Sequence, residues 1–171
     1  MQTNVVLIGM PGAGKSSVGV LLAKALGMSF VDTDLLIQEK SGRLLQTIID
    51  QDGVERFLAM EEAVILQLER ENSVIATGGS AIYSEATINH LKRNGKLIYL
   101  KLKYEEIESR IKNMSSRGIA MGKGQRLIDL YNERVVLYEK YADIIVDCSG
   151  TVIESVVGKI SNRIKANLAR S

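Results

Sequence analysis

The stretch from Gly9 to Ser16 constrains this chain more than any other. It reads GMPGAGKS and fits the pattern G-x-x-x-x-G-K-[ST] at every fixed position. The apolar run at residues 4–8 precedes it, as a buried parallel strand would, and apolar residues follow it at helical spacing. Glycines let successive backbone N–H groups point inward, and a helix N-terminus adds positive partial charge. We therefore predict a site for a nucleoside triphosphate. The alternative is a glycine turn that merely precedes a lysine.

The roles within this loop follow from its chemistry. Lys15 would reach the β- and γ-phosphates, and the Ser16 hydroxyl would ligate Mg²⁺. The residues of the loop that we expect to bind the nucleotide are Gly12, Ala13, Gly14, Lys15, Ser16 and Ser17.

Composition narrows the class of protein. The chain has 171 residues, 46% of them apolar, so we expect residues 1–171 to form one domain. A formal net charge of +2 is too small to favour nucleic acid or a membrane surface as partner. The partner that we expect is a small-molecule substrate. No apolar run reaches the roughly 18 residues of a spanning helix, and the start MQTNVVLIG lacks a basic signal segment, so we expect a cytoplasmic protein. The single cysteine excludes an internal disulfide and a cysteine-based zinc site, and the single histidine argues against a His-dependent triad or a multi-His metal site.

Five apolar segments alternate with helical patterns along the chain. The segments are residues 4–8, 28–34, 74–77, 97–102 and 144–147, and the longer helical patterns cover 15–26, 55–70, 84–92, 104–112, 126–141 and 152–168. Such alternation predicts an α/β fold of three layers, α/β/α, in which a five-stranded parallel sheet has helices on both faces. In such sheets, ligands bind at the carboxyl ends of the strands.

Asp32 and Asp34 stand at the end of the second expected strand. Their spacing places both carboxylates on one side if the strand continues through Asp34. We assign Asp32 to Mg²⁺, and we expect Asp34 to orient an acceptor hydroxyl and accept its proton. The alternative is a pair of solvated turn aspartates in which Asp34 caps the next helix.

Two glycine-containing loops complete the expected site. Gly78, Gly79 and Ser80 follow the third strand, where glycine would let the backbone approach a ligand; the alternative is a plain tight turn. Residues 114–124 carry three glycines and little periodicity, and we expect a mobile lid at about 112–125 that places Arg117 over the phosphates. An exposed loop with incidental charge is the alternative.

These motifs, in this order, resemble shikimate kinase across nearly the whole length. The matching pieces are the loop at 9–16, F-V-D-T-D at 30–34, G-V-E-R-F at 53–57, Gly78-Gly79, Arg117, and E-R-x-x-L-Y at 133–138. The resemblance implies that ATP and Mg²⁺ are the cofactors and that shikimate is converted to shikimate 3-phosphate. It also implies a P-loop kinase domain with its acceptor segment at about 33–62, and the size and family favour a monomer.

The resemblance also implies residue roles. It assigns Asp34 to the substrate hydroxyls, Arg134 to the substrate carboxylate, Arg117 to the ATP phosphates and Arg110 to the neighbourhood of the adenine. The implied catalytic residues are then Lys15, Asp34 and Arg117. The implied acceptor-binding residues are Asp34, Leu58, Gly78, Gly79, Ser80 and Arg134.

Three departures from the family pattern lie mostly on the acceptor side. Leu58 stands where the family usually has an arginine that binds the carboxylate, and losing such a partner costs on the order of 2–5 kcal/mol. Arg56 is a candidate substitute, although on a helix it would point elsewhere. Ser80 replaces the third glycine, and residues 117–120 read R-G-I-A rather than R-P-L-L.

Three functions therefore stay open from the sequence. They are a shikimate kinase with an adapted carboxylate site, a related kinase for another small hydroxylated acceptor, and a nucleotide-binding module without turnover. Lys15, Asp32, Asp34 and Arg117 together argue against the last.

Overall fold

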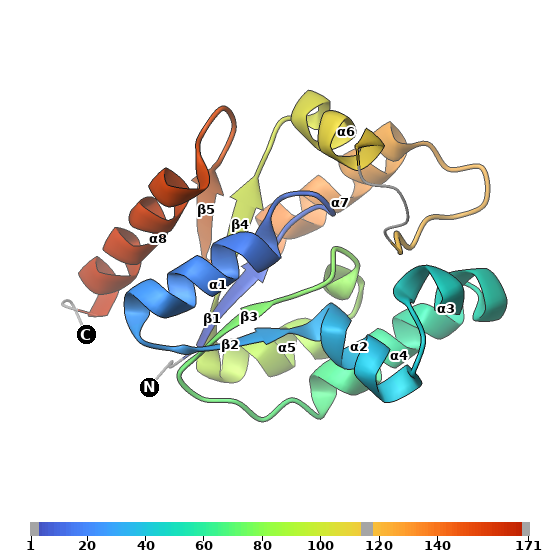
Figure 1. Cartoon of the computed structure of the whole chain (residues 1–171), viewed down its shortest axis with the longest axis horizontal. Coiled ribbons are helices and arrows are strands. Elements are labelled where there is room, and N and C mark those ends of the chain that lie inside the picture. The colour runs from blue at the N-terminus through green and yellow to red at the C-terminus, as the bar shows by residue number, and fades with distance from the viewer. Residues whose placement is uncertain (1–3, 114–117, 169–171) are drawn as a thin grey trace.

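The computed structural model describes residues 4–113 and 118–168, and five parallel strands form its sheet (Figure 1). The strands are β1 (Asn4–Ile8), β2 (Ser29–Asp32), β3 (Ser73–Ala76), β4 (Gly95–Lys101) and β5 (Ile144–Asp147), in the order β2-β3-β1-β4-β5. The register sets Val6 of β1 beside Ile75 of β3 and Leu97 of β4. All five carboxyl ends therefore meet at one edge, as the sequence predicts.

Helices cover both faces of this sheet. They are α1 (Lys15–Leu26), α2 (Thr33–Ser41), α3 (Leu45–Asp52), α4 (Val54–Leu66), α5 (Glu85–Asn94), α6 (Tyr104–Lys112), α7 (Leu127–Tyr141) and α8 (Ile153–Leu168), with a short 3-10 helix η1 (Ala81–Tyr83). Helices α1 and α8 pack together on one face, and α5 and α7 pack on β4 from the other (Figure 1). Helices α2, α3 and α4 form a separate group beyond β2 (Figure 1). The predicted three-layer fold is confirmed.

Two hydrophobic clusters hold these layers. The larger one contains the strands and the inner faces of the helices that cover them, and Val6, Leu7, Leu22 and Leu97 in it are fully buried. The smaller cluster lies within the α2–α4 group; its buried members are Ile37, Leu45, Ile48, Phe57, Val64 and Ala120. Ala120 belongs to the expected lid segment, so this segment packs against the α2–α4 group.

Two predicted boundaries are wrong. The strand expected at 28–34 ends at Asp32, because Asp32 Oδ1 accepts hydrogen bonds from the N–H groups of Asp34 and Leu35 and so starts α2. The cap is Asp32 and not Asp34. The helix expected at 55–70 ends at Leu66. Beyond this end, the Leu68 carbonyl pairs with His90 Nε2 at 2.9 Å and not with a helical N–H group.

No helix in residues 4–113 or 118–168 combines the length and apolar character needed to span a membrane.

Candidate active site

A cavity of about 320 Å³ lies at the carboxyl ends of the strands. The phosphate loop, the start of α2, the turn after β3, the lid segment and α7 all contribute to its wall. Of the residues predicted from the sequence, it is lined by Gly12, Gly14, Lys15, Ser16, Ser17, Asp34, Gly78, Gly79, Ser80 and Arg134. Segments far apart in the chain thus meet at one cavity, as expected for an open parallel sheet.

The phosphate loop has the conformation that its glycines allow. Gly12 and Gly14 have φ angles of 81° and 86°, which side chains rarely adopt, and Gly14 leads directly into α1. Lys15 is 8% exposed, and its Nζ donates to the carbonyls of Gly9 at 2.6 Å and Met10 at 2.8 Å. The carbonyls of the loop therefore hold the ammonium group within the loop, near the N–H groups at the start of α1.

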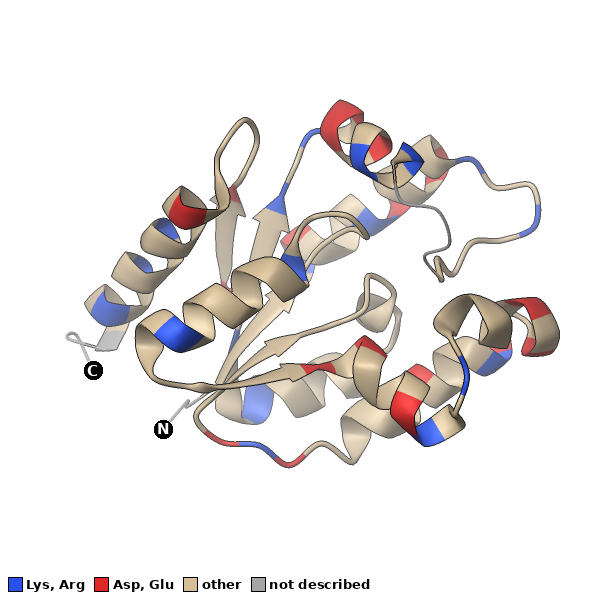
Figure 2. Cartoon of the chain, in the orientation of Figure 1, with Lys and Arg blue, Asp and Glu red and all other residues tan. Residues whose placement is uncertain are grey.

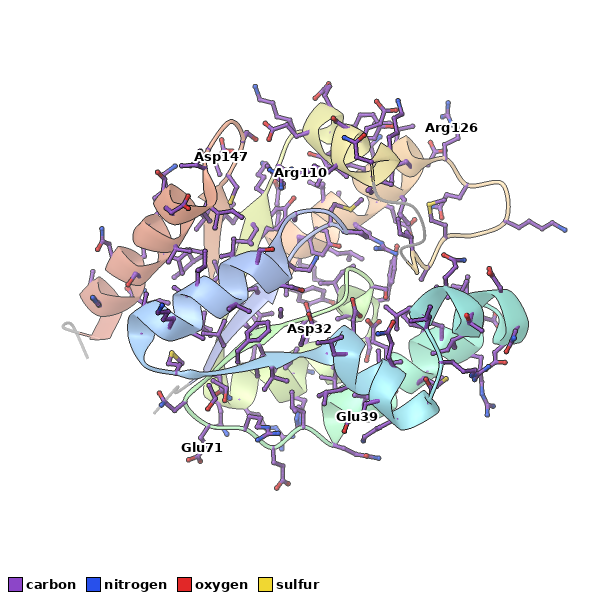
Figure 3. The ribbon with its side chains drawn as sticks, viewed as in Figure 1. Asp32, Glu39, Glu71, Arg110, Arg126 and Asp147 are labelled. Atoms are coloured by element: carbon purple, nitrogen blue, oxygen red, sulfur yellow. The ribbon has the colours of Figure 1, made fainter. Side chains whose placement is uncertain are left out.

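Ser16 and Asp32 form an oxygen pair at the edge of this loop. The Ser16 hydroxyl donates to Asp32 Oδ2 at 2.6 Å, while Oδ1 of the same carboxylate caps α2. Figure 3 shows Asp32 between the end of β2 and the first turn of α1. A hydroxyl and a carboxylate are ligands that suit Mg²⁺, which otherwise keeps water and phosphate oxygens. This pair fits the metal, although no cluster of three or more acidic, His or Cys residues occurs in the described part of the chain.

The glycine turn after β3 lies against charged groups on both sides. A Cβ built at Gly78 would overlap Glu61 Oε2 and lie 2.7 Å from Asp34 Oδ1. A Cβ at Gly79 would lie 2.8 Å from Arg134 Nη1 and 2.8 Å from a ring carbon of Pro11. A side chain at Gly78 would therefore displace Glu61 and Asp34, and one at Gly79 would displace Arg134 or Pro11.

Arg134 is held in place from several directions. It is 1% exposed, its Nε donates to the Tyr83 hydroxyl at 3.1 Å, and its Nη2 donates to the Ala120 carbonyl at 2.7 Å. The guanidinium also lies 5.3 Å from the centre of the Tyr83 ring. On the same helix, Tyr138 donates to the Gly79 carbonyl at 2.5 Å. These contacts aim a fixed guanidinium fork at the cavity, which is the geometry that binds a carboxylate.

Glu61 of α4 is a buried acid that the sequence analysis missed. It is 2% exposed, and its Oε1 accepts from the Ser80 hydroxyl at 2.7 Å. Burial, and secondarily the charge of Asp34, raise its pKa to about 7 against the opposing effects of Ser80 and Arg134. A signal was present in the sequence, because Glu61 stands four residues from both Phe57 and Ile65, in the middle of an apolar helix face.

The remaining predicted residues lie around the cavity or away from it. Arg110 Nη1 donates to the Gly12 carbonyl at 3.1 Å, so its side chain lies on the phosphate loop (Figure 3), and Ala13 is buried beneath it. Leu58 is not in the cavity wall; it packs against the smaller hydrophobic cluster, because the helix turns it about 100° away from its neighbour Phe57, which does line the cavity. Arg56 is exposed. Arg117 lies outside the described residues.

The wall also contains residues that the sequence analysis did not single out as ligands. They are Pro11, Gln38, Leu44, Leu45, Gln46, Phe57, Thr77, Gly118, Ile119 and Ala120. The last three belong to the lid segment, which therefore forms one side of the cavity. Charges outside the cavity are mixed: both acidic and basic residues occur on α4, α6 and α7 (Figure 2).

The fold and this cavity define an ATP-dependent small-molecule kinase of the P-loop type. The model of the family described as "Shikimate kinase" matches residues 11–165. The chain therefore belongs to the shikimate kinase family.

Individual members of this family are similar to the chain over nearly its whole length. The shikimate kinase of Clostridium botulinum (strain Eklund 17B / Type B) is 36% identical over 168 residues, which is 98% of this chain and 100% of the relative. The structure of the shikimate kinase from Acinetobacter baumannii in complex with shikimate is 32% identical, with a TM-score of 0.86 over 98% of this chain and 95% of that one. The enzyme from Aquifex aeolicus is 30% identical, with a TM-score of 0.79 over 98% and 99% of the two chains.

Proposed function

We propose that this chain transfers the γ-phosphate of ATP to a ring hydroxyl of shikimate, giving shikimate 3-phosphate, with Mg²⁺ as the metal. The observation that carries the proposal is that the phosphate loop, Asp34 and Arg134 line the same cavity of about 320 Å³. A site for a triphosphate is thereby continuous with a site for a hydroxylated anion. The relative whose structure is described as holding shikimate supports this choice of acceptor.

On the donor side, this chain's residues bind and neutralise phosphate. Lys15 and the N-terminus of α1 stabilise the charge that develops on the transferring phosphoryl group. Ser16 and Asp32 would hold Mg²⁺, which supplies further charge neutralisation when bound. Arg110 lies on the loop through its bond to the Gly12 carbonyl, and we expect its side chain to lie near the adenine.

On the acceptor side, Asp34 and Arg134 act at two ends of the substrate. Asp34 would orient the reacting hydroxyl and accept its proton. Arg134 would bind the carboxylate through its guanidinium fork. The lid segment from Gly118 to Ala120 closes this side of the cavity and keeps water from competing with the hydroxyl.

The test is ADP release with ATP and Mg²⁺ in the presence of a panel of acceptors. The panel contains shikimate, quinate, and a cyclic polyol without a carboxylate. We expect turnover of shikimate, a phosphorylated product by ³¹P NMR, and a loss of turnover in Asp34→Asn. Turnover of the polyol without turnover of shikimate would show that the acceptor is wrong. ATP binding without turnover of any acceptor would contradict kinase activity itself.

A further inference from the structure

One of the family departures bonds a buried acid, Glu61, and a second stands about one helical turn before that acid on α4. Ser80 stands at the third position of the glycine turn, and its hydroxyl donates to Glu61 Oε1 at 2.7 Å. Leu58 stands three residues before Glu61 on α4, the spacing at which helical side chains are neighbours. The first departure adds a neutral hydrogen-bond donor to Glu61, and the second removes a cation from its neighbourhood.

Glu61 lies directly behind the wall of the acceptor cavity. Gly78, Ser80 and Asp34 line that cavity. Glu61 Oε1 accepts from Ser80, and Oε2 lies so close to Gly78 that a Cβ built there would overlap it. It is 2% exposed, and Oε2 has no hydrogen-bond partner among the described residues. A buried carboxylate with one unpartnered oxygen is costly, whereas a protonated carboxyl costs much less.

The charges around Glu61 do not offset this cost. Asp34 of α2 favours the proton on Glu61, while Arg134 of α7 and Lys15 of α1 oppose it, and the outcome is a pKa raised to about 7. Helices α3 and α5 pack against α4 through apolar side chains of the two clusters, and Tyr138 faces Glu61 as a neutral hydroxyl. Glu61 can therefore change its charge close to neutral pH.

We propose that Glu61 and Ser80 form a neutral hydrogen-bonded wall behind the acceptor cavity, and that loss of the Glu61 proton weakens the binding of an anionic acceptor. The positive charge of Arg134 explains why ionisation of Glu61 weakens acceptor binding. When Glu61 is neutral, Arg134 is available to the carboxylate of the acceptor; when Glu61 is ionised, it competes for that cation and repels the substrate anion. Glu61 is thus a specificity-determining residue that acts through Ser80, Gly78 and Arg134. The inference depends on the proposed function because it requires an anionic acceptor.

The kinetic test measures the KM for shikimate between pH 6 and pH 8 at saturating ATP and Mg²⁺. One proton with a pKa near 7 predicts a rise of about tenfold in this KM, without a parallel change in the KM for ATP. Glu61→Gln keeps a neutral group of the same shape, so its KM for shikimate should stay flat. Glu55→Gln, at an exposed position on the same helix, should follow the unchanged protein. A KM that rises equally in Glu61→Gln would overturn the proposal.

A second measurement does not depend on turnover. We expect the ¹³C NMR signal of one glutamate carboxyl, assigned as the one absent from Glu61→Gln, to titrate near pH 7 in the ligand-free protein. Titration of every glutamate below pH 5.5 would refute the neutral wall even if shikimate is the substrate. A midpoint near 7 without shikimate turnover would support the neutral wall and contradict only the proposed acceptor.

Two further variants keep the test sharp if Glu61→Gln does not fold. Ser80→Ala removes a hydrogen bond that favours the ionised form, so it should move the midpoint to higher pH. Leu58→Arg adds a cation at the neighbouring helical position and should move the midpoint to lower pH. Shifts in the same direction, or no shifts, would count against the proposal.

Discussion

Arg134 Nη2 donates a hydrogen bond of 2.7 Å to the carbonyl oxygen of Ala120. This bond joins α7, which carries the group expected to hold the substrate carboxylate, to the lid segment that forms one side of the cavity. Ala120 is also a buried member of the cluster shared with α2, α3 and α4. If Arg134 binds the acceptor as proposed, we expect acceptor binding to affect the position of the lid segment through this hydrogen bond.

Arg134→Lys should test this coupling directly. Lysine keeps the charge but lacks the planar fork whose separate nitrogens bond Tyr83 and Ala120 and leave N–H groups for a carboxylate. We expect kcat/KM for shikimate to fall by about 100-fold, in line with about 3 kcal/mol for a truncated buried ionic contact, with a much smaller change in the KM for ATP. Arg126→Lys, whose side chain is 77% exposed, serves as the control. If the KM for ATP changed as much as kcat/KM for shikimate, Arg134 would support the fold rather than bind the acceptor.

Asp32 has two functions that different substitutions separate. Asn at this position can still cap α2, whereas Ala cannot, so Asp32→Ala should lower the free energy of unfolding by about 1 kcal/mol relative to Asp32→Asn. Both variants lose the carboxylate that pairs with Ser16. We expect the Mg²⁺ concentration for half-maximal activity to rise about 10- to 100-fold in both. Thermal unfolding and Mg²⁺ titration of activity measure the two effects, and an unchanged Mg²⁺ requirement would exclude Asp32 from the metal site.

Some of this site follows from local sequence, and some does not. The phosphate loop and the strand before it are local patterns, and the approach of Asp32 to Ser16 follows once parallel strands end at one edge. The extent of β2 was predicted wrongly because a side-chain cap at Asp32 competes with strand continuation. A helix cap at Asp32 and continuation of the strand differ in free energy by about 1 kcal/mol, and strand propensity alone does not decide between them.

The contacts of Glu61 cannot be predicted from local sequence patterns. Its bond to Ser80 joins residues 19 positions apart, and it depends on how α4 is rotated against the turn after β3. The same rotation removes Leu58 from the cavity wall and brings Phe57 into it. The family pattern marks position 80 as unusual, but only the packed structure shows that the Ser80 hydroxyl bonds the Glu61 carboxyl group.

The raised pKa of Glu61 also predicts how stability changes with pH. In the unfolded chain this group loses its proton near pH 4.5, and in the folded protein it does so at about 7. Between these values only the folded state binds the proton, so the contribution of Glu61 to the free energy of unfolding falls as the pH rises and is constant above about 7. Glu61→Gln lacks this proton. Its stability relative to the unchanged protein should therefore increase from pH 4.5 to 7, by on the order of 3 kcal/mol, as measured by urea unfolding.

The absence of a side chain at Gly118 lets the lid segment approach α3 closely. A Cβ built there would overlap the Leu45 side chain, and it would lie 2.8 Å from the Leu45 carbonyl carbon and 2.9 Å from the Gln46 nitrogen. Gly118→Ala must therefore move the lid segment away from a wall of the cavity that both α3 residues share. Because a displacement of about 1 Å can cost 100-fold in rate, we expect kcat/KM for shikimate to fall by about 10- to 100-fold.

Gly122→Ala is the matched control for this variant, because its added Cβ would meet only Gln125, no closer than 3.6 Å. It places the same methyl group in the same loop without touching α3. Steady-state kinetics of the two variants should therefore differ, with Gly122→Ala close to the unchanged protein. Equal losses would point to a general effect of alanine on the loop backbone. Full activity in Gly118→Ala would show that close contact between Gly118 and Leu45 is not needed for turnover, and that closure of the cavity depends instead on the bond between Arg134 and Ala120.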